Sequence, residues 1–159
     1  MTTNTIAFTG HRPPKLGLTW EGQGQRDLDI ITQMAMTLEL QRATVVISGM
    51  ALGIDQLGAR AALRLGIPFD AYCPFPGQAA MWSHGCQETY YSLLEQARRV
   101  IYTQPIYSIT AFQTRNEQMV DVADWLFAYW DGSPGGTANC IEYAKTTDIH
   151  INYYERNQT

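Results

Sequence analysis

The fold is decided by residues 44–55, TVVISGMALGID. Residues 44–47 are all β-branched, which is typical of a strand buried on both faces of a parallel sheet. Gly49 and Gly53 interrupt this run, and apolar residues then recur every three or four positions over residues 54–65, the period of an amphipathic helix. The stretch therefore predicts a strand, a tight turn and a helix in succession.

The same alternation of short β-rich runs and helical periods extends in both directions along the chain. Strands separated by helix-length segments indicate right-handed βαβ units. We therefore expect an α/β fold, a Rossmann-like three-layer sandwich with a mostly parallel central sheet, as one domain over residues 1–159 with a polar tail at about 155–159. The expected strands are 5–9, 44–47, 67–73, 100–102, 125–129 and 149–151; the expected helices are about 28–38, 54–65, 90–97, 115–123 and 138–144, the last N-capped by Thr137, with a loop at 103–113.

The composition indicates which partners and which cellular compartment to expect. The 159 residues carry a net charge of −4 and no block of Lys or Arg, so we expect no nucleic-acid polymer among the partners. The three cysteines are odd in number and lack C-x-x-C spacing, which fits free thiols in a reducing compartment and predicts no metal site. The sequence begins with no signal-peptide pattern and holds no apolar run of about 20 residues. We expect a cytoplasmic protein with no membrane partner and no cofactor.

Small molecules bind to sheets of this kind outside the carboxyl ends of the strands. After the first expected strand, Gly10 permits close backbone approach, and His11 and Arg12 could contact an anionic or planar ligand. The alternative is a turn in which both side chains are merely solvated.

The second strand end, from Ser48 to Asp55, combines two glycines with a helix start. The backbone N–H groups around Gly49 and Gly53 suit a phosphate, although such turns also serve for packing alone. Asp55 could accept a hydrogen bond from a ribose hydroxyl, or could only complement the helix dipole.

The turn at Asp131 to Thr137 is a more specific indication. Gly135 and Gly136 at a helix start form an anion cradle, to which Ser133 and Thr137 add hydroxyl donors. We interpret this turn as ligand-binding, against the alternative of plain turn chemistry.

Four side chains complete the candidate set. Arg115 and Asn116 open the helix before the fifth strand, where a cation is poorly placed for the helix dipole unless an anion offsets the cost. Trp82 could cover a base, or could pack on the core. Glu142 lies one turn into the last helix and could be catalytic, or could be an ordinary surface residue.

The four segments, taken in order, resemble the YpsA-like branch of the SLOG superfamily, whose relatives include DprA/Smf proteins and the LOG phosphoribohydrolases. The resemblance extends from residue 6 to about residue 146. It rests on FTGHRP (8–13), SGMALGID (48–55), RNEQMV (115–120) and DGSPGGT (131–137). It implies a Rossmann-like fold, a nucleotide pocket at the carboxyl edge of the sheet, and a homo-oligomer.

The resemblance also implies a reaction, from which this sequence departs. LOG-type members cleave nucleoside 5′-monophosphates between base and ribose, using an Arg that Arg115 matches and a Glu three residues after the P-G-G-x-G-T turn. Here that position is Cys140, and Glu142 follows two residues later, about 200° further around a helix. We therefore expect a sensor or sequestering domain for a phosphorylated nucleotide or nucleotide-derived molecule. The alternative is a LOG-like phosphoribohydrolase in which Arg115 orients the phosphate and Glu142 or Asp131 stabilises the reacting centre. DNA binding of the DprA kind is a third reading, which the acidic charge disfavours.

Overall fold

A computed structural model describes residues 2–154, and its centre is a six-stranded sheet in which every pairing is parallel. The strands lie in the order β4-β3-β2-β1-β5-β6. The strands are β1 (Thr5–Gly10), β2 (Val45–Ser48), β3 (Phe69–Cys73), β4 (Arg99–Tyr102), β5 (Trp125–Tyr129) and β6 (His150–Tyr154); the α-helices are α1 (Gln25–Leu40), α2 (Ile54–Leu65), α3 (His84–Gln96), α4 (Ala111–Val122) and α5 (Gly136–Ala144).

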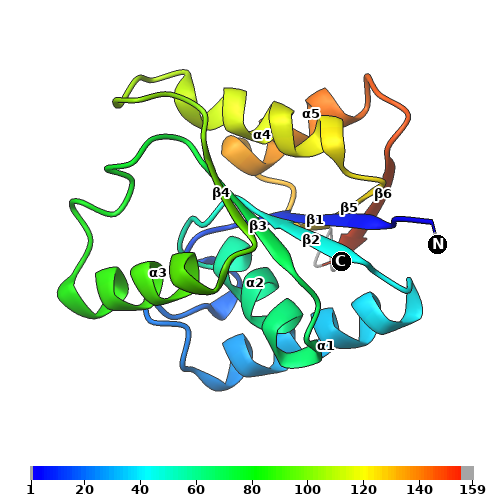
Figure 1. Cartoon of the computed structure of the whole chain (residues 1–159), viewed down its shortest axis with the longest axis horizontal. Helices are drawn as coiled ribbons and strands as arrows, with labels where there is room; N and C mark the ends of the chain where they lie inside the picture. Colours follow the sequence, from blue (N-terminus) through cyan, green and yellow to red (C-terminus); the bar gives the residue numbers. More distant parts are fainter. Residues whose placement is uncertain (1, 155–159) are drawn as a thin grey trace.

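The helices form two layers on opposite faces of the sheet. Figure 1 shows α1, α2 and α3 on one face and α4 and α5 on the other. The larger apolar core lies under the first three helices and includes Phe8, Met34 and Phe127, whereas Met119 and Ile141 are buried under α4 and α5. The expected α/β, Rossmann-like three-layer sandwich is therefore confirmed, and the sheet is parallel throughout.

The strand order reverses next to β1. The chain runs outward from β1 through β2 and β3 to β4, and then returns across the sheet to place β5 on the other side of β1. Because the connections after β1 and β5 leave toward opposite sides, a crevice opens between their carboxyl ends. This switch point is where a parallel sheet of this topology binds ligands.

Several expected boundaries were wrong. Helix α4 begins at Ala111, so Arg115 lies in its second turn rather than at its start. Helix α3 begins at His84 because the Ser83 hydroxyl accepts a hydrogen bond from the Cys86 backbone N–H. Thr137 does not cap α5, whose N-cap is Gly135. The last strand continues to Tyr154, and the expected polar tail at 155–159 lies outside the described residues. Of the described helices, none is both long and apolar enough to cross a membrane.

Candidate functional site

A pocket of about 390 Å³ lies at the switch point between β1 and β5. Four segments line it: residues 9–15 at the end of β1 and in the loop after it, Ala51 with Asp55 near the start of α2, three residues of α4 (Phe112, Arg115 and Asn116), and residues 134–137 at the start of α5. Of the residues proposed from the sequence, the pocket brings together Gly10, His11, Arg12, Asp55, Arg115, Asn116, Gly135, Gly136 and Thr137.

A wider hollow of about 940 Å³ lies at the opposite, amino-terminal edge of the sheet, between Asn4, Arg42 and His150. It contains none of the residues proposed from the sequence. The pocket between β1 and β5 is therefore the candidate site.

The start of α5 supplies backbone N–H groups to this pocket. Gly135 has a φ of +142°, which side chains rarely permit, and a Cβ built on either Gly135 or Gly136 would meet no atom within 4 Å. Thr137 is buried at the pocket wall. The first N–H groups of a helix have no partners within the helix and carry its positive dipole end, so this wall suits an anion.

Arg115 crosses the floor of the pocket from α4 and is only 4% exposed. Its Nη1 donates to the backbone oxygens of Gly49 and Tyr72, and its Nε donates to Oδ1 of Asn116 at 2.9 Å. Burial lowers the pKa of this guanidinium, and the Asp55 carboxylate partly offsets that effect. An arginine remains protonated at neutral pH even so, which makes Arg115 a buried positive charge.

Asp55 is the acidic residue that lines the pocket. Its Oδ2 accepts a hydrogen bond from the Ala51 backbone N–H at 3.3 Å. Burial raises its pKa above the ordinary aspartate value, and the charge of Arg115 acts in the opposite direction. A Cβ on Gly49 would lie 2.8 Å from both Asp55 Oδ2 and Arg115 Nη1. The absence of a side chain at position 49 therefore lets both charged groups lie against the end of β2.

The start of α2 is already occupied by the protein itself. The backbone oxygen of His11 accepts a hydrogen bond from the Ile54 N–H at 3.3 Å, and a Cβ on Gly53 would lie 2.5 Å from that oxygen. Ser48 likewise turns inward, because its hydroxyl donates to the Asp55 carbonyl at 2.8 Å. Gly53 thus lets the loop after β1 pack on the start of α2, and Ser48 ties the end of β2 to α2. The open anion cradle of the pocket is at α5.

This packing predicts that an alanine costs more stability at Gly53 than at Gly66, although both glycines have positive φ. Gly53 (φ +91°) touches the backbone of His11, whereas Gly66 (φ +69°) has nothing within 4 Å of a built Cβ. Gly66→Ala should cost about 1 kcal/mol for backbone conformation alone. Gly53→Ala adds a backbone clash and should cost about 2 kcal/mol. Urea unfolding of both variants measures the difference, and equal losses would contradict the close packing at Gly53.

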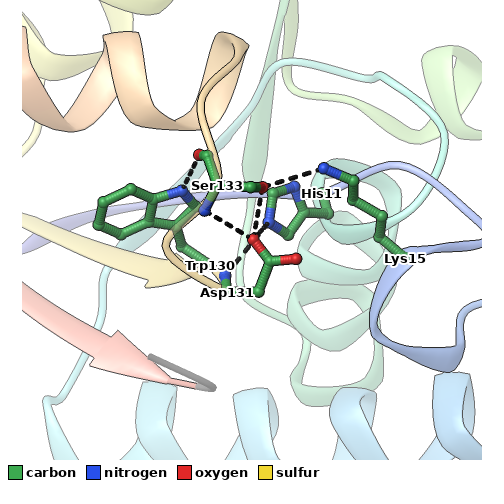
Figure 2. A network of polar contacts seen from close by, with 5 residues as sticks. All are labelled: His11, Lys15, Trp130, Asp131 and Ser133. Carbon is green, nitrogen blue, oxygen red and sulfur yellow. Dashed lines mark hydrogen bonds and ion pairs between the residues drawn. The ribbon is translucent and has the colours of Figure 1, made fainter. Parts of the chain in front are cut away.

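A polar network fixes the loop after β5 to the loop after β1 (Figure 2). His11 Nε2 lies 2.8 Å from Asp131 Oδ1, which also accepts hydrogen bonds from the backbone N–H and hydroxyl of Ser133. Lys15 Nζ donates to the Ser133 hydroxyl at 3.0 Å, and Trp130 Nε1 donates to the Ser133 carbonyl. The two Ser133 hydrogen bonds, with a contribution from His11, hold the pKa of Asp131 well below its usual range. Asp131 and Ser133 therefore shape the turn that leads to Gly135.

Seven of the proposed residues do not line the pocket: five belong to the segments next to it (Ser48, Gly49, Gly53, Asp131 and Ser133), and two lie elsewhere. Trp82 packs edge-on against Tyr90, with ring centroids 5.3 Å apart, beside the larger core. Glu142 is exposed on α5 and pairs with Lys145 at 3.1 Å. Neither side chain lines the pocket.

The sequence reasoning missed the aromatic residue that does line the pocket. Phe112 lies within the segment expected to be a loop, but it is three residues before Arg115 on α4. Residues at this spacing share one face of a helix. Extending the helix by one turn toward the amino end would have predicted Phe112 beside Arg115.

Comparison with known proteins gives a family and one curated relative. The model of the YspA SLOG family matches residues 6–157. The uncharacterized SPbeta prophage-derived protein YoqJ of Bacillus subtilis is 33% identical over 86 residues, which are 46% of this chain and 50% of YoqJ. The match thus spans about half the length of that relative.

Three solved structures share the fold at low identity. DNA processing protein A (DprA) from Helicobacter pylori gives a TM-score of 0.68 at 17% identity, over 96% of this chain and 65% of the neighbour. DprA from Streptococcus pneumoniae gives 0.66 at 15%, over 95% and 50%. The molybdenum cofactor binding protein from Rippkaea orientalis gives 0.64 at 14%, over 99% and 79%.

These neighbours correct the expectation that no nucleic-acid polymer is among the partners. The H. pylori structure concerns single-stranded DNA binding by a protein of this fold. A net charge of −4 was the wrong criterion, because nucleic-acid binding depends on the local charge of a groove rather than on the sum over the chain. Arg12 and Lys15 are both exposed residues that line the pocket.

Proposed function

Because the chain belongs to the YspA SLOG family, whose model covers residues 6–157, we propose that it binds a phosphorylated nucleotide or nucleotide-derived molecule in the pocket between β1 and β5. The protein acts as a sensor or sequestering domain for that ligand, which is a free nucleotide or the terminal nucleotide of a strand.

The observation that carries this proposal is a buried arginine opposite an open helix start. Nε and Nη1 of Arg115 donate to protein oxygens, and among residues 2–154 no hydrogen-bond acceptor is found for Nη2. A phosphate in the pocket can therefore accept from Nη2 of Arg115 and from the N–H groups of Gly136 and Thr137. Charge-assisted hydrogen bonds of this kind are about twice as strong as neutral ones.

Asp55 and Asn116 supply the groups that a ribose needs. The carboxylate of Asp55 accepts hydrogen bonds from hydroxyl groups, and Oδ1 of Asn116 is held by Arg115, so that its amide N–H₂ is oriented as a donor. Carboxylate pairing with ribose hydroxyls is common in Rossmann-like sites. The pocket volume of about 390 Å³ lies in the range of small-molecule sites.

The position and environment of the acids favour binding over hydrolysis. Glu142 pairs with Lys145, Asp131 is held by His11 and Ser133, and neither lines the pocket. Burial raises the pKa of the Cys140 thiol to about 11, so this side chain is neutral at physiological pH. The phosphoribohydrolase alternative therefore has no specific observation in its favour.

Gly136→Ala tests the site without disturbing the fold. A Cβ at position 136 meets no protein atom within 4 Å, so the midpoint of thermal unfolding without ligand should stay within about 1 °C. The same methyl group stands where the phosphate approaches the helix start, so affinity should fall at least about tenfold. The measurement is calorimetric titration with the four nucleoside 5′-monophosphates, ADP-ribose and a short oligodeoxythymidine.

Gly77→Ala is the matched control. Gly77 is exposed, lies outside the pocket, and a Cβ there would make an ordinary 3.7 Å contact with Phe75, so binding should be unchanged. Failure of every compound to bind the unaltered protein, or equal binding by the Gly136→Ala variant, would contradict the proposed site. Release of free base during titration would identify a hydrolase instead.

A further inference from the structure

One wall of the pocket is aromatic and is held by a small aromatic cluster. Phe112 packs edge-on against Phe75, with ring centroids 5.7 Å apart and planes at 89°, and against Tyr107 at 6.5 Å. Phe75 and Tyr107 themselves make an edge-on pair at 5.5 Å. These three rings come from the segment after β3, the loop after β4 and the first turn of α4. The orientation of the Phe112 ring is therefore fixed by two neighbours.

Arg12 lies over the ring of Phe112, with its Cζ 5.6 Å from the ring centroid. This cation–π contact is worth little at an exposed site, and Arg12 is exposed. Within residues 2–154 its guanidinium has no hydrogen-bond acceptor. The side chain therefore has a preferred position over the ring without being locked there.

We infer that Arg12 and Phe112 form a clamp for the base of the ligand, an inference that rests on the proposed function. Planar groups stack at about 3.5 Å, so a base between guanidinium and ring needs about 7 Å. The observed 5.6 Å requires Arg12 to retreat by little more than 1 Å. Guanidinium and phenyl planes are the two surfaces on which proteins most often stack bases.

The clamp also orients the ligand along α4. Phe112 lies one helical turn before Arg115 and Asn116 on the same face of α4, and the start of α5 closes the pocket opposite. A base on Phe112 therefore directs the ribose and phosphate toward Asn116 and Arg115. The ligand class that follows is a nucleoside phosphate, and purines should bind more tightly than pyrimidines because their larger rings stack over more area.

The test compares two ligands in two proteins. Calorimetric titration measures adenosine or guanosine 5′-monophosphate against ribose 5-phosphate, which has the same phosphate and sugar but no base. In the unaltered protein the better purine nucleotide should bind at least about tenfold more tightly than ribose 5-phosphate. Phe112→Leu keeps an apolar side chain but removes the stacking surface, and should remove that advantage while leaving ribose 5-phosphate binding unchanged.

Arg12→Lys provides a second variant that does not depend on the aromatic cluster. Lysine keeps the positive charge and loses the planar surface, so the base advantage should shrink severalfold and ribose 5-phosphate should again bind as before. If ribose 5-phosphate binds and none of the four nucleoside 5′-monophosphates binds more tightly than it does, the clamp alone is overturned. Equal losses for both ligands in Phe112→Leu would assign Phe112 a purely structural role and also overturn it. If neither ligand class bound the unaltered protein, the proposed function would fall together with the clamp.

Discussion

Replacing Arg115 with methionine is expected to lower the free energy of unfolding by about 3–5 kcal/mol and to abolish measurable binding of nucleotides. Arg115 is buried, donates to the carbonyls of Gly49 and Tyr72, and carries a charge that opposes that of the Asp55 carboxylate. Removing the cation leaves the buried Asp55 carboxylate with only the weaker opposing charge of Arg12. It also removes a donor from each of two backbone oxygens, of which that of Gly49 keeps the Gln78 side-chain amide. Weakening the charge compensation of a buried carboxylate and removing charged hydrogen bonds in this way is strongly destabilising. Urea unfolding and calorimetric titration measure the two effects separately.

The stability lost in Arg115→Met should increase as the pH rises. Burial raises the folded-state pKa of Asp55, and removing Arg115 raises it further because the opposing charge is gone. A group with a raised pKa binds more protons in the folded state, so stability falls as pH rises from the unfolded value of about 3.9 through the folded pKa. The deficit should therefore be smaller at pH 4.5 than at pH 7.5.

The double variant Asp55→Asn/Arg115→Met separates the charge effect from packing. Removing both charges should recover part of the lost stability at pH 7.5 and should flatten the pH dependence. Nucleotide binding should stay lost, because the phosphate still lacks its counter-charge. A single variant as stable as the unaltered protein, with no dependence on pH, would show that the charge of Arg115 does not stabilise the Asp55 carboxylate.

The alternation of strands and helices could be predicted because burial imposes a simple period on apolar residues. The run at Val45 to Ser48 is buried at every position, as a central parallel strand requires. Glycine positions were equally informative, since Gly10, Gly135 and Gly136 all line the pocket. Pattern reasoning therefore recovers which strand ends approach one another.

Pattern reasoning fails where the role of a residue depends on a distant partner. Gly53 resembles an anion-binding glycine, but His11 occupies the helix start. Trp82 resembles a base-stacking residue but meets Tyr90. Phe112 was missed because no local signal marks the start of α4, where Thr110 makes no side-chain cap.

Asp70→Asn is expected to cost about 3 kcal/mol of stability at pH 7. Asp70 on β3 is fully buried and accepts hydrogen bonds from both Arg98, at 2.7 and 2.9 Å, and Arg99, at 2.9 and 3.3 Å. Hydrogen bonds to a buried charge are worth about 1.5–3 kcal/mol each. The expected loss of stability is smaller than the sum of these hydrogen-bond energies, because both arginines are about half exposed and their guanidinium groups can rotate toward solvent. The neutral amide keeps the shape of the side chain, so the measurement isolates its charge.

The matched control is Glu142→Gln, which breaks the exposed pair with Lys145 and should change stability by less than about 0.5 kcal/mol.

Asp70 should also show the opposite pH dependence to Asp55. Despite the burial of the carboxylate, its hydrogen bonds to Arg98 and Arg99 hold its pKa below the ordinary value. Its contribution is therefore present above the unfolded pKa of about 3.9 and is lost as pH falls below it. The difference between Asp70→Asn and the unaltered protein should be constant from pH 5 to 8 and should narrow below pH 4.

The loss in Asp70→Asn should first appear at the edge of the sheet. Within residues 2–154, strand β4 is an edge strand paired with β3, and Arg99 is the residue directly opposite Asp70 in that pairing. Without the carboxylate, β4 keeps its backbone hydrogen bonds but loses the charged contact that holds its first residues. Because edge elements open locally at lower free energy than the core, amide exchange over residues 99–102 should accelerate more than exchange in β1 or β5. Equal acceleration in all three strands would mean that Asp70 stabilises the whole domain rather than its edge.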